Sequence, residues 1–396
     1  MHAAAWILPV LAIAGPVGQA RADEHMVLVD TIDVGGKGLG AFDISFVDPK
    51  LNLYVLADRT NASVDLFNAQ DATFIGRIGG FKGVVSTNGV VNNNLSGPDG
   101  VTVVGNSEIW AGDGDSTVKV IDIATNNIVD TIPTGGSFRC DEMAWDSTDH
   151  ILAVANNADT PPFVTLINTD TRTIVQKIVF DGTGTTPNAT NGLEQPQWSA
   201  QTGLFYVSVP QVGSDPAQGG LSVIDPSTSS VVATYLVQQC GPAGLTLGPN
   251  HQALLGCAAA FGTSPNVLTQ SVVMDITTGT VVATIPQVGG SDEVWYDSAT
   301  RHYYLGARSN QTSSGVVAPV LGTIDAIGNV FDGNVPTSTS AHSVAVDKVS
   351  HHVFVPIGFV AAGASDPTNP CPTKGCIAVY LPSSVDADDA PRVASK

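Results

Sequence analysis

Short runs of alternating apolar and polar residues, separated by turns rich in glycine, asparagine and aspartate, recur along the whole chain. One set is easiest to follow after residue 98, where we predict four strands at residues 100–104, 108–111, 118–123 and 128–132. Runs of this length, rich in Val, Ile and Thr and bounded by turn residues, are typical of β-strands. No segment has the apolar spacing of a long amphipathic helix. The pattern therefore predicts an all-β protein.

The four-strand unit occurs seven times. The segment that starts at Asp141 aligns with the one that starts at Asp292, and the third strand recurs at residues 164–168, 221–225, 271–275 and 321–325. Equivalent positions in successive repeats lie 42 to 56 residues apart, which is typical of a β-propeller with one four-stranded blade per repeat. Because each blade packs only on its neighbours, we predict a single seven-bladed β-propeller over residues 23–382.

The last repeat ends after residues 376–380 without a fourth strand of its own. A segment that closely matches the missing strand lies at the other end of the chain, at residues 27–36, which resemble residues 128–136. We therefore expect the N-terminal strand to join the last blade, close the ring and leave no open sheet edge. Residues 383–396 are predicted to be a polar tail.

The beginning of the chain has the features of a targeting segment. An apolar stretch from Ala3 to Ala14 is followed by Ala20, Arg21 and Ala22, a pattern typical of signal peptidase sites. The stretch is too short to span a membrane. We predict a signal peptide at residues 1–22 and a periplasmic or secreted protein with no membrane span.

Charge and cysteine content fit that location. The formal net charge of −20 repels nucleic acid and anionic lipid, so we expect no nucleic-acid partner, and we expect a monomer. Five cysteines in an exported chain suggest two disulfides and one remaining thiol. Folding the hairpin at residues 249–250 brings Cys240 opposite Cys257, and Cys371 and Cys376 flank a short turn. Cys140 is left alone.

One position in the repeats is unusually polar. It lies just before the first strand of each unit, beside the predicted axis, on the face that also carries the long links between second and third strands. Long loops around a polar axial ring are where a propeller is expected to bind. The seven residues at this position are Asp43, Asp99, Asp141, Gln195, Ala243, Asp292 and His342.

Several carboxylates at one axis repel one another unless something neutralises them. A divalent cation would do so, and we predict that Asp43, Asp99, Asp141, Asp292 and His342 bind one. Oxygen ligands favour Ca²⁺, Mg²⁺ or Mn²⁺, whereas His342 and a nearby Cys140 would favour a transition metal such as Zn or Fe. The competing interpretation is structural: the same residues could hydrogen-bond loop backbone or line a wet channel.

Aromatic residues also lie on or near the first strands of several repeats. Side chains at these positions are expected to pack between blades and not to stack on a ligand. These residues are Phe46, Trp145, Trp198, Trp295 and Tyr296.

The repeats resemble a known family. Residues 241–250, third strands such as 221–225 and fourth strands such as 231–234 and 281–286 are similar to those of the YVTN-type, lactonase-like seven-bladed propellers of exported bacterial proteins. The literal Tyr-Val-Thr-Asn motif is absent. The family includes binding proteins, surface proteins and enzymes, so the resemblance implies a fold more than a function.

Two functional hypotheses follow. In the first, the chain is an exported binding or scaffold propeller that holds a small molecule or a protein partner on its long-loop face. In the second, it is a metal-dependent hydrolase or lyase acting on a lactone or ester. In that case the cation polarises a carbonyl or activates water, and Glu142 or Glu293 acts as general base.

Overall fold

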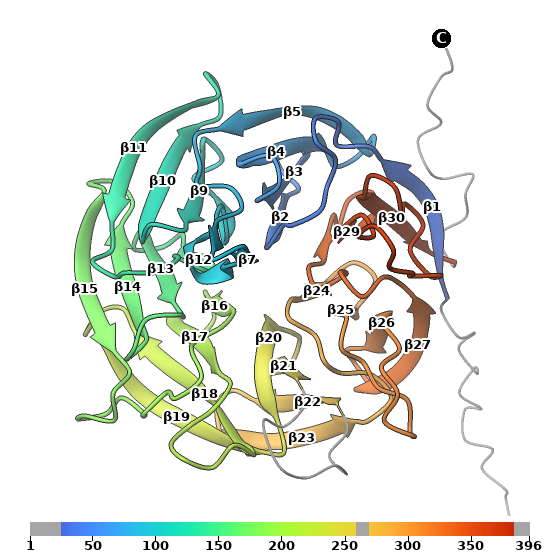
Figure 1. The fold of residues 1–396 in the computed structure, drawn as a ribbon. Helices are drawn as coiled ribbons and strands as arrows, with labels where there is room; N and C mark the ends of the chain where they lie inside the picture. The colour runs from blue at the N-terminus through green and yellow to red at the C-terminus, as the bar shows by residue number, and fades with distance from the viewer. Residues whose placement is uncertain (1–24, 259–268, 384–396) are drawn as a thin grey trace, which may run out of the picture.

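Seven four-stranded antiparallel sheets are arranged in a ring around a central axis (Figure 1). The computed structural model describes residues 25–258 and 269–383. It confirms the prediction of an all-β, seven-bladed β-propeller. The signal peptide predicted for residues 1–22 lies outside the described residues, as does the predicted polar tail apart from Ser383.

Six of the blades are built from four strands that follow one another in the chain, with the first strand innermost. Blade 1 contains β2 (Ser45–Asp48), β3 (Leu53–Asp58), β4 (Ser63–Asn68) and β5 (Thr73–Gly79). Blade 2 contains β8 (Val101–Val104), β9 (Glu108–Asp113), β10 (Thr117–Asp122) and β11 (Asn127–Pro133). Blade 3 contains β12 (Met143–Asp146), β13 (Ile151–Asn156), β14 (Phe163–Asn168) and β15 (Thr173–Val179).

The second half of the ring follows the same order. Blade 4 contains β16 (Pro196–Ser199), β17 (Leu204–Val209), β18 (Gln218–Asp225) and β19 (Ser230–Gln238). Blade 5 contains β20 (Gly241–Leu247), β21 (Gln252–Ala258), β22 (Gln270–Asp275) and β23 (Thr280–Ile285). Blade 6 contains β24 (Val294–Asp297), β25 (His302–Ala307), β26 (Val320–Asp325) and β27 (Val330–Pro336).

The seventh blade takes its outer strand from the N-terminus, as the sequence predicts. Its three inner strands come from the C-terminal end of the chain and are β28 (Ala345–Val346), β29 (Val353–Ile357) and β30 (Cys376–Pro382). The fourth strand is β1 (Met26–Ile32), which pairs antiparallel with β30. The register runs from Met26 opposite Pro382 to Ile32 opposite Ile377. The two ends of the described chain thus close the ring, because β1 pairs with the edge of β30 that would otherwise be exposed.

A β-bulge marks the outer strand pair of every blade. In blades 1 to 6 the register of the third and fourth strands shifts near the same point, for example between Leu66 and Phe67 or between Thr323 and Ile324. The pair formed by β1 and β30 has a corresponding shift between Leu28 and Asp30. A bulge increases the local twist of a strand, so its recurrence indicates that β1 is equivalent to the other fourth strands.

The hydrophobic core lies between neighbouring blades. Between blades 7 and 1, for instance, Tyr54 stacks on Phe354 with ring centroids 4.5 Å apart, and both rings are fully buried together with Ile377. Comparable clusters fill the other spaces around the ring. Each blade therefore depends on its two neighbours for burial of its faces.

Many of the acidic residues form turns. Asp146 and Asp297 are the last residues of inner strands. The Oδ1 atom of each accepts a hydrogen bond from the backbone N–H of the residue two positions later in the chain. Asp225 and Asp275 do the same between third and fourth strands. Such side chains stabilise tight turns, and the backbone and hydroxyl donors around Asp225 lower the pKa of its carboxyl. These repeated aspartates explain much of the negative charge without a functional role.

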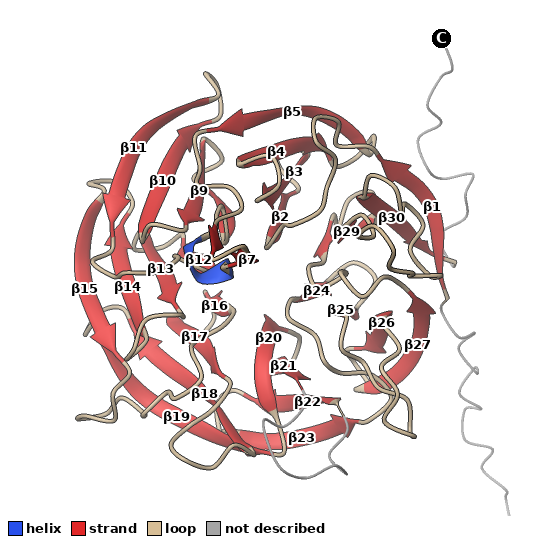
Figure 2. Cartoon of the chain, in the orientation of Figure 1, coloured by secondary structure: helices blue, strands red, loops and turns tan. Residues whose placement is uncertain are grey.

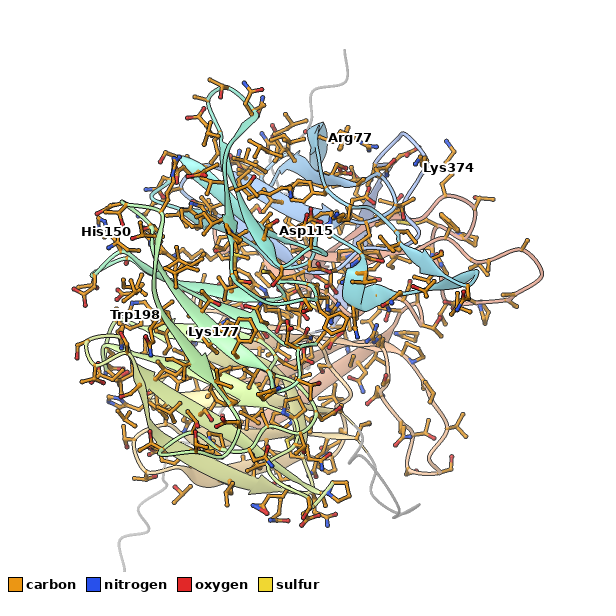
Figure 3. All side chains as sticks on the ribbon, turned by 60° about the vertical axis from the view of Figure 1, so that its left-hand side comes forward. Arg77, Asp115, His150, Lys177, Trp198 and Lys374 are labelled. Atoms are coloured by element: carbon orange, nitrogen blue, oxygen red, sulfur yellow. A yellow bond between two sulfur atoms is a disulfide. The ribbon has the colours of Figure 1, made fainter. Side chains whose placement is uncertain are left out.

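The two faces of the ring differ in their connections. First and second strands are joined by short turns, and this face is called the turn face below. The opposite face, the loop face, carries the long links at residues 157–162, 210–217, 308–319 and 358–375. Seen nearly from the side, His150 and Trp198 lie toward the turn face, and Asp115 and Lys374 lie toward the loop face (Figure 3).

An insertion at residues 81–97 enters the loop face between blades 1 and 2. It forms the small hairpin of β6 (Ser86–Thr87) and β7 (Val90–Val91), followed by the 3₁₀ helix η1 (Asn93–Leu95). The helical turn lies close to the axis (Figure 2).

Two disulfides staple the chain, Cys240 to Cys257 and Cys371 to Cys376, and Cys140 is a buried free thiol. Both pairings agree with those expected from the sequence. Disulfides persist in oxidising compartments, so they indicate that the protein folds in one. No helix in the described ranges is long and apolar enough to cross a membrane.

Ring closure by β1 predicts a measurable difference between the two sides of that strand. Ile32 is 7% exposed and packs against Ile377, whereas Val29 on the same strand is 47% exposed. Ile32→Ala should lower the free energy of unfolding by about 2–4 kcal/mol because it leaves a cavity. Val29→Ala should change it by less than about 0.5 kcal/mol. A loss for Ile32→Ala as small as that for Val29→Ala in chemical denaturation would contradict closure of the ring by β1.

Candidate functional site

The polar ring predicted at the axis is present, with one correction of register. In blade 3, Asp141 N donates to Ala155 O, and Glu142 O accepts from Ala155 N. In blade 4 the same two roles belong to Glu194, whose N donates to Ser208 O, and to Gln195, whose O accepts from Ser208 N. Glu194, and not Gln195, is therefore the fourth-blade equivalent of Asp141.

With this correction, five carboxylates and one imidazole occupy the seven equivalent positions. We call this set the axial ring. Its members are Asp43, Asp99, Asp141, Glu194, Ala243, Asp292 and His342. The residue after each member forms a second layer along the axis, and this layer includes Glu142, Gln195, Glu293 and Ser343.

Two arginines form ion pairs with the first three carboxylates of the axial ring. Arg59, in the turn between β3 and β4, forms ion pairs with both Asp43 and Asp99, and its side chain is 5% exposed. Arg139, two residues before Asp141, reaches Asp141 at 2.7 Å and Asp43 at 3.3 Å. Guanidinium groups thus fill the part of the axis where the sequence suggested a cation.

The insertion covers this half of the axial ring. Asn94 O, in η1, accepts a hydrogen bond of 2.9 Å from Arg139 N. Asp99 is fully buried and Asp141 is 2% exposed. Asn157 bridges the network, since its amide donates to Asp141 and its Oδ1 accepts from Arg139 Nε at 3.3 Å. The network is therefore a closed, largely dry ion-pair cluster.

The other half of the ring is more open. Asp292 pairs with Arg308 at 3.0 Å, and both side chains are partly exposed, at 28% and 42%. His342 lies 3.5 Å from Asp43, donates a hydrogen bond of 2.7 Å from Nδ1 to Ser340 O, and stacks on Phe42. Asp292 and His342 therefore have protein partners of their own.

The titration behaviour follows from burial and from the distribution of the arginines. Burial raises the pKa of Asp43, but Arg59 and Arg139 outweigh it and hold that pKa well below its usual value. Asp141 has less compensation, and burial raises its pKa to about 7. Burial, reinforced by neighbouring acids, raises the pKa of Glu142 and of Glu194 well above the usual range. On the side of the axis formed by blades 3 and 4, carboxyl groups therefore outnumber the basic side chains that could pair with them.

The two candidate general bases differ in their surroundings. Glu293 Oε1 accepts from Trp295 Nε1 at 2.9 Å, and its Oε2 accepts from Ser343 Oγ at 2.5 Å. Burial raises the pKa of Glu293 to about 8, although these donors lower it. Glu142 is 3% exposed, and among the described residues its Oε2 has no hydrogen-bond partner.

The remaining predicted residues can be placed as well. Cys140 is fully buried beside Thr134 and Asn156, and burial raises the pKa of its thiol to about 12, so it is not a reactive thiolate. Within residues 25–258 and 269–383, no group of three or more His, Cys, Asp or Glu side chains is arranged to hold a metal ion. The axial metal therefore stays a prediction.

The aromatic rings pack both within and between blades: Trp198 contacts Phe205 of its own blade at 4.8 Å, whereas Phe46 of blade 1 contacts Trp295 of blade 6 at 5.3 Å. Tyr296 packs on Tyr303 at 5.3 Å. Four of the five rings also line a cavity on the axis, which the sequence did not suggest.

A hollow of about 560 Å³ lies on the loop face beside the axial ring. Its walls come from the insertion, the β13–β14 link and the β15–β16 link. They include Asn94, Asn157, Asp159, Asp181 and Glu194, and no Lys, Arg or His is among the lining residues. Asp159 Oδ1 accepts from Ser137 N at 2.9 Å, whereas its Oδ2 is buried with no partner in the described part of the chain.

Comparisons with known proteins support the fold alone. No protein-family model matches the chain, and no curated protein matches it by sequence. A chain of Kuenenia stuttgartiensis hydrazine synthase is similar with a TM-score of 0.63 and 13% identity, covering 80% of this chain and 92% of that one. A chain in the crystal structure of the mitotic checkpoint complex is similar with a TM-score of 0.61 and 11% identity, covering 96% and 98%.

The arginine network makes a clear prediction for stability. Arg59→Met leaves Asp43 and Asp99 buried without their main partner, so it should lower the free energy of unfolding by about 3–5 kcal/mol. Arg308→Met removes the more exposed partner of Asp292 and should cost no more than about 1 kcal/mol. Denaturant titration of both variants tests this difference. Similar losses in the two variants would contradict the structural role assigned to Arg59.

Proposed function

We propose that this protein is an exported binding propeller that engages a protein partner through its loop face. The observation that carries the proposal is the loop-face hollow, which is polar, acidic and anchored to the buried ion-pair cluster through Asn157. A loop on a rigid base can present side chains in fixed positions. A periplasmic or secreted location, and membership in the YVTN-type, lactonase-like group, are part of the proposal.

The chemistry of the hollow defines the partner. Asp159, Asp181 and Glu194 bring three carboxyl groups to walls that carry no basic residue. The unpartnered Oδ2 of Asp159 is a ready acceptor for a charged N–H donor. A Lys or Arg side chain on an exposed segment of the partner fits these conditions. The similar chain in the mitotic checkpoint complex also belongs to a complex, which agrees with a scaffold role.

Peptide selection tests the proposal without a known partner. A random peptide library displayed on phage and selected on the wild-type protein should become enriched in Lys and Arg. Selected peptides should bind Asp159→Asn about tenfold more weakly or worse, because a charge-assisted hydrogen bond is lost. Asp170→Asn, an exposed carboxylate on the turn face, is the matched control and should bind normally. Peptides without basic residues, or equal binding by both variants, would refute the proposal.

A metal-dependent hydrolase or lyase acting on a lactone or ester is the alternative. It is favoured by one observation on Glu142 and Glu293. Each is a buried acid that directly follows a member of the axial ring, and burial raises the pKa of both. A general base beside a metal would have the same position and a raised pKa.

The alternative predicts near one equivalent of divalent metal in protein purified without chelators or an affinity metal. Elemental analysis by mass spectrometry measures it, and the metal should be lost in Asp141→Ala and His342→Ala. A wild-type protein that holds no metal even after reconstitution would rule the alternative out.

A further inference from the structure

A cavity of about 250 Å³ lies on the axis, between the axial ring and the turn face. Its walls are formed by residues that follow ring members along the inner strands, such as Phe46 three positions after Asp43 and Trp295 three positions after Asp292. Several of the lining rings are partly exposed, so the cavity opens toward the turn face. It is separate from the loop-face hollow, with which it shares no lining residue.

Two carboxyl groups lie at the inner end of this cavity. Glu293 is satisfied by Trp295, Ser343 and the Val344 backbone. Glu142 is 97% buried, and its Oε2 has no partner in the described ranges. A buried acceptor without a donor costs about 1–3 kcal/mol or more. This cost would be recovered if a bound molecule supplied the donor.

Aromatic rings form much of the remaining wall. Phe46 and Trp295 meet edge to face with centroids 5.3 Å apart, bridging the small Ala345 of the blade between them. Trp145 and Trp198 line the cavity from blades 3 and 4, and their Nε1 atoms have no acceptor among the described residues. Aromatic faces attract cations, most strongly when water is excluded.

The lining also excludes other ligand classes. It contains no Lys, Arg or His, so an anion would find no positively charged side chain to pair with. A neutral apolar molecule would leave Glu142 without its donor. A hydrated metal ion needs several oxygen ligands, whereas most of this wall is carbon. An organic cation matches both the carboxyl group and the rings, and the net charge of −20 favours its approach.

We propose that the axial cavity is a binding site for a small organic ammonium ion, with Glu142 accepting its N–H and with Trp145, Trp198 and Trp295 surrounding its charged end. The cavity volume of about 250 Å³ admits a ligand of roughly ten non-hydrogen atoms or fewer. The two tryptophan Nε1–H groups can serve a hydroxyl group on the same molecule. This site acts independently of the loop face, so either proposal can fail alone.

The test uses three probes of equal length, namely butylammonium, 1-butanol and butyrate. Isothermal titration calorimetry with the full-length mature protein should show saturable binding of butylammonium and at least tenfold weaker binding of the other two. Tetramethylammonium, which has no N–H, should bind more weakly than butylammonium because only the aromatic rings can hold it. Glu142→Gln should weaken butylammonium at least about tenfold. Asp170→Asn, which removes an exposed carboxylate, should leave its affinity unchanged.

Ala144→Leu provides a second variant, because Ala144 lines the cavity and a larger side chain fills it while leaving Glu142 intact. It should abolish binding as well. If neither variant folds, the wild-type comparison decides: no measurable binding of butylammonium, or equal binding of 1-butanol, overturns the proposal. Binding that survives in a folded Glu142→Gln or Ala144→Leu also overturns it, since the probe then occupies another site.

Discussion

Seven blades can meet at one axis only if the charges that they bring there are compensated. This chain brings five carboxylates in the axial ring alone, and a buried carboxylate without a partner is among the costliest groups in a protein. Arg59 and Arg139 meet that requirement in part, by pairing with Asp43, Asp99 and Asp141 from the loop face, although burial still raises the pKa of Asp99 and of Asp141. Because each guanidinium contacts residues of two or three blades, the ion pairs also link neighbouring blades.

The compensation is uneven around the axis, and this unevenness divides the acids into distinct groups. On the side of blades 1 to 3 the carboxylates are tied to arginines and covered by the insertion, which makes them structural. On the side of blades 3 to 6, burial raises the pKa of Glu142, Glu194 and Glu293, and neighbouring acids raise the pKa of Glu142 and Glu194 further. A third group, the turn aspartates, lies on the turn face and stabilises hairpins. The acidic residues of this chain therefore point to a function only where their side chains are buried and poorly paired.

The fold could be predicted because every blade repeats the same local pattern. The strands expected at residues 108–111 and 128–132 are observed at Glu108–Asp113 and Asn127–Pro133, and the closing strand was visible as a near copy of residues 128–136. The Cys240–Cys257 disulfide followed from hairpin geometry, and the Cys371–Cys376 disulfide from the short turn that its two cysteines flank. These features depend on neighbours in the sequence or on exact repetition, which a single sequence displays.

The site was only partly predictable, for a physical reason. The ring members repeat, but Arg59 and Arg139 occupy non-repeating positions in links, so no alignment of the repeats marks them. Their proximity to Asp43 and Asp99 depends on the three-dimensional course of two loops. The shift from Gln195 to Glu194 was within reach of the sequence, since counting back from Trp198 and Ser199, which match Trp145 and Asp146, gives the correct register.

The inner strands connect the two ends of the axis, and their alternation explains why the ends differ in chemistry. A ring residue is followed by the second-layer residue and then by positions that face neighbouring blades near the turn face. The second-layer residue of blade 2 is Gly100. A Cβ atom on Gly100 would collide with the carbonyl oxygen of Asp141, so blades 2 and 3 approach closely there. No side chain of blade 2 can therefore fill the axis at this level. Where the second layer is Glu142, the blade carries a long acid into space that glycine leaves free. The cavity thus results from the same packing that brings the ring together, and its unpartnered acid lies where the arginines of the loop face do not reach.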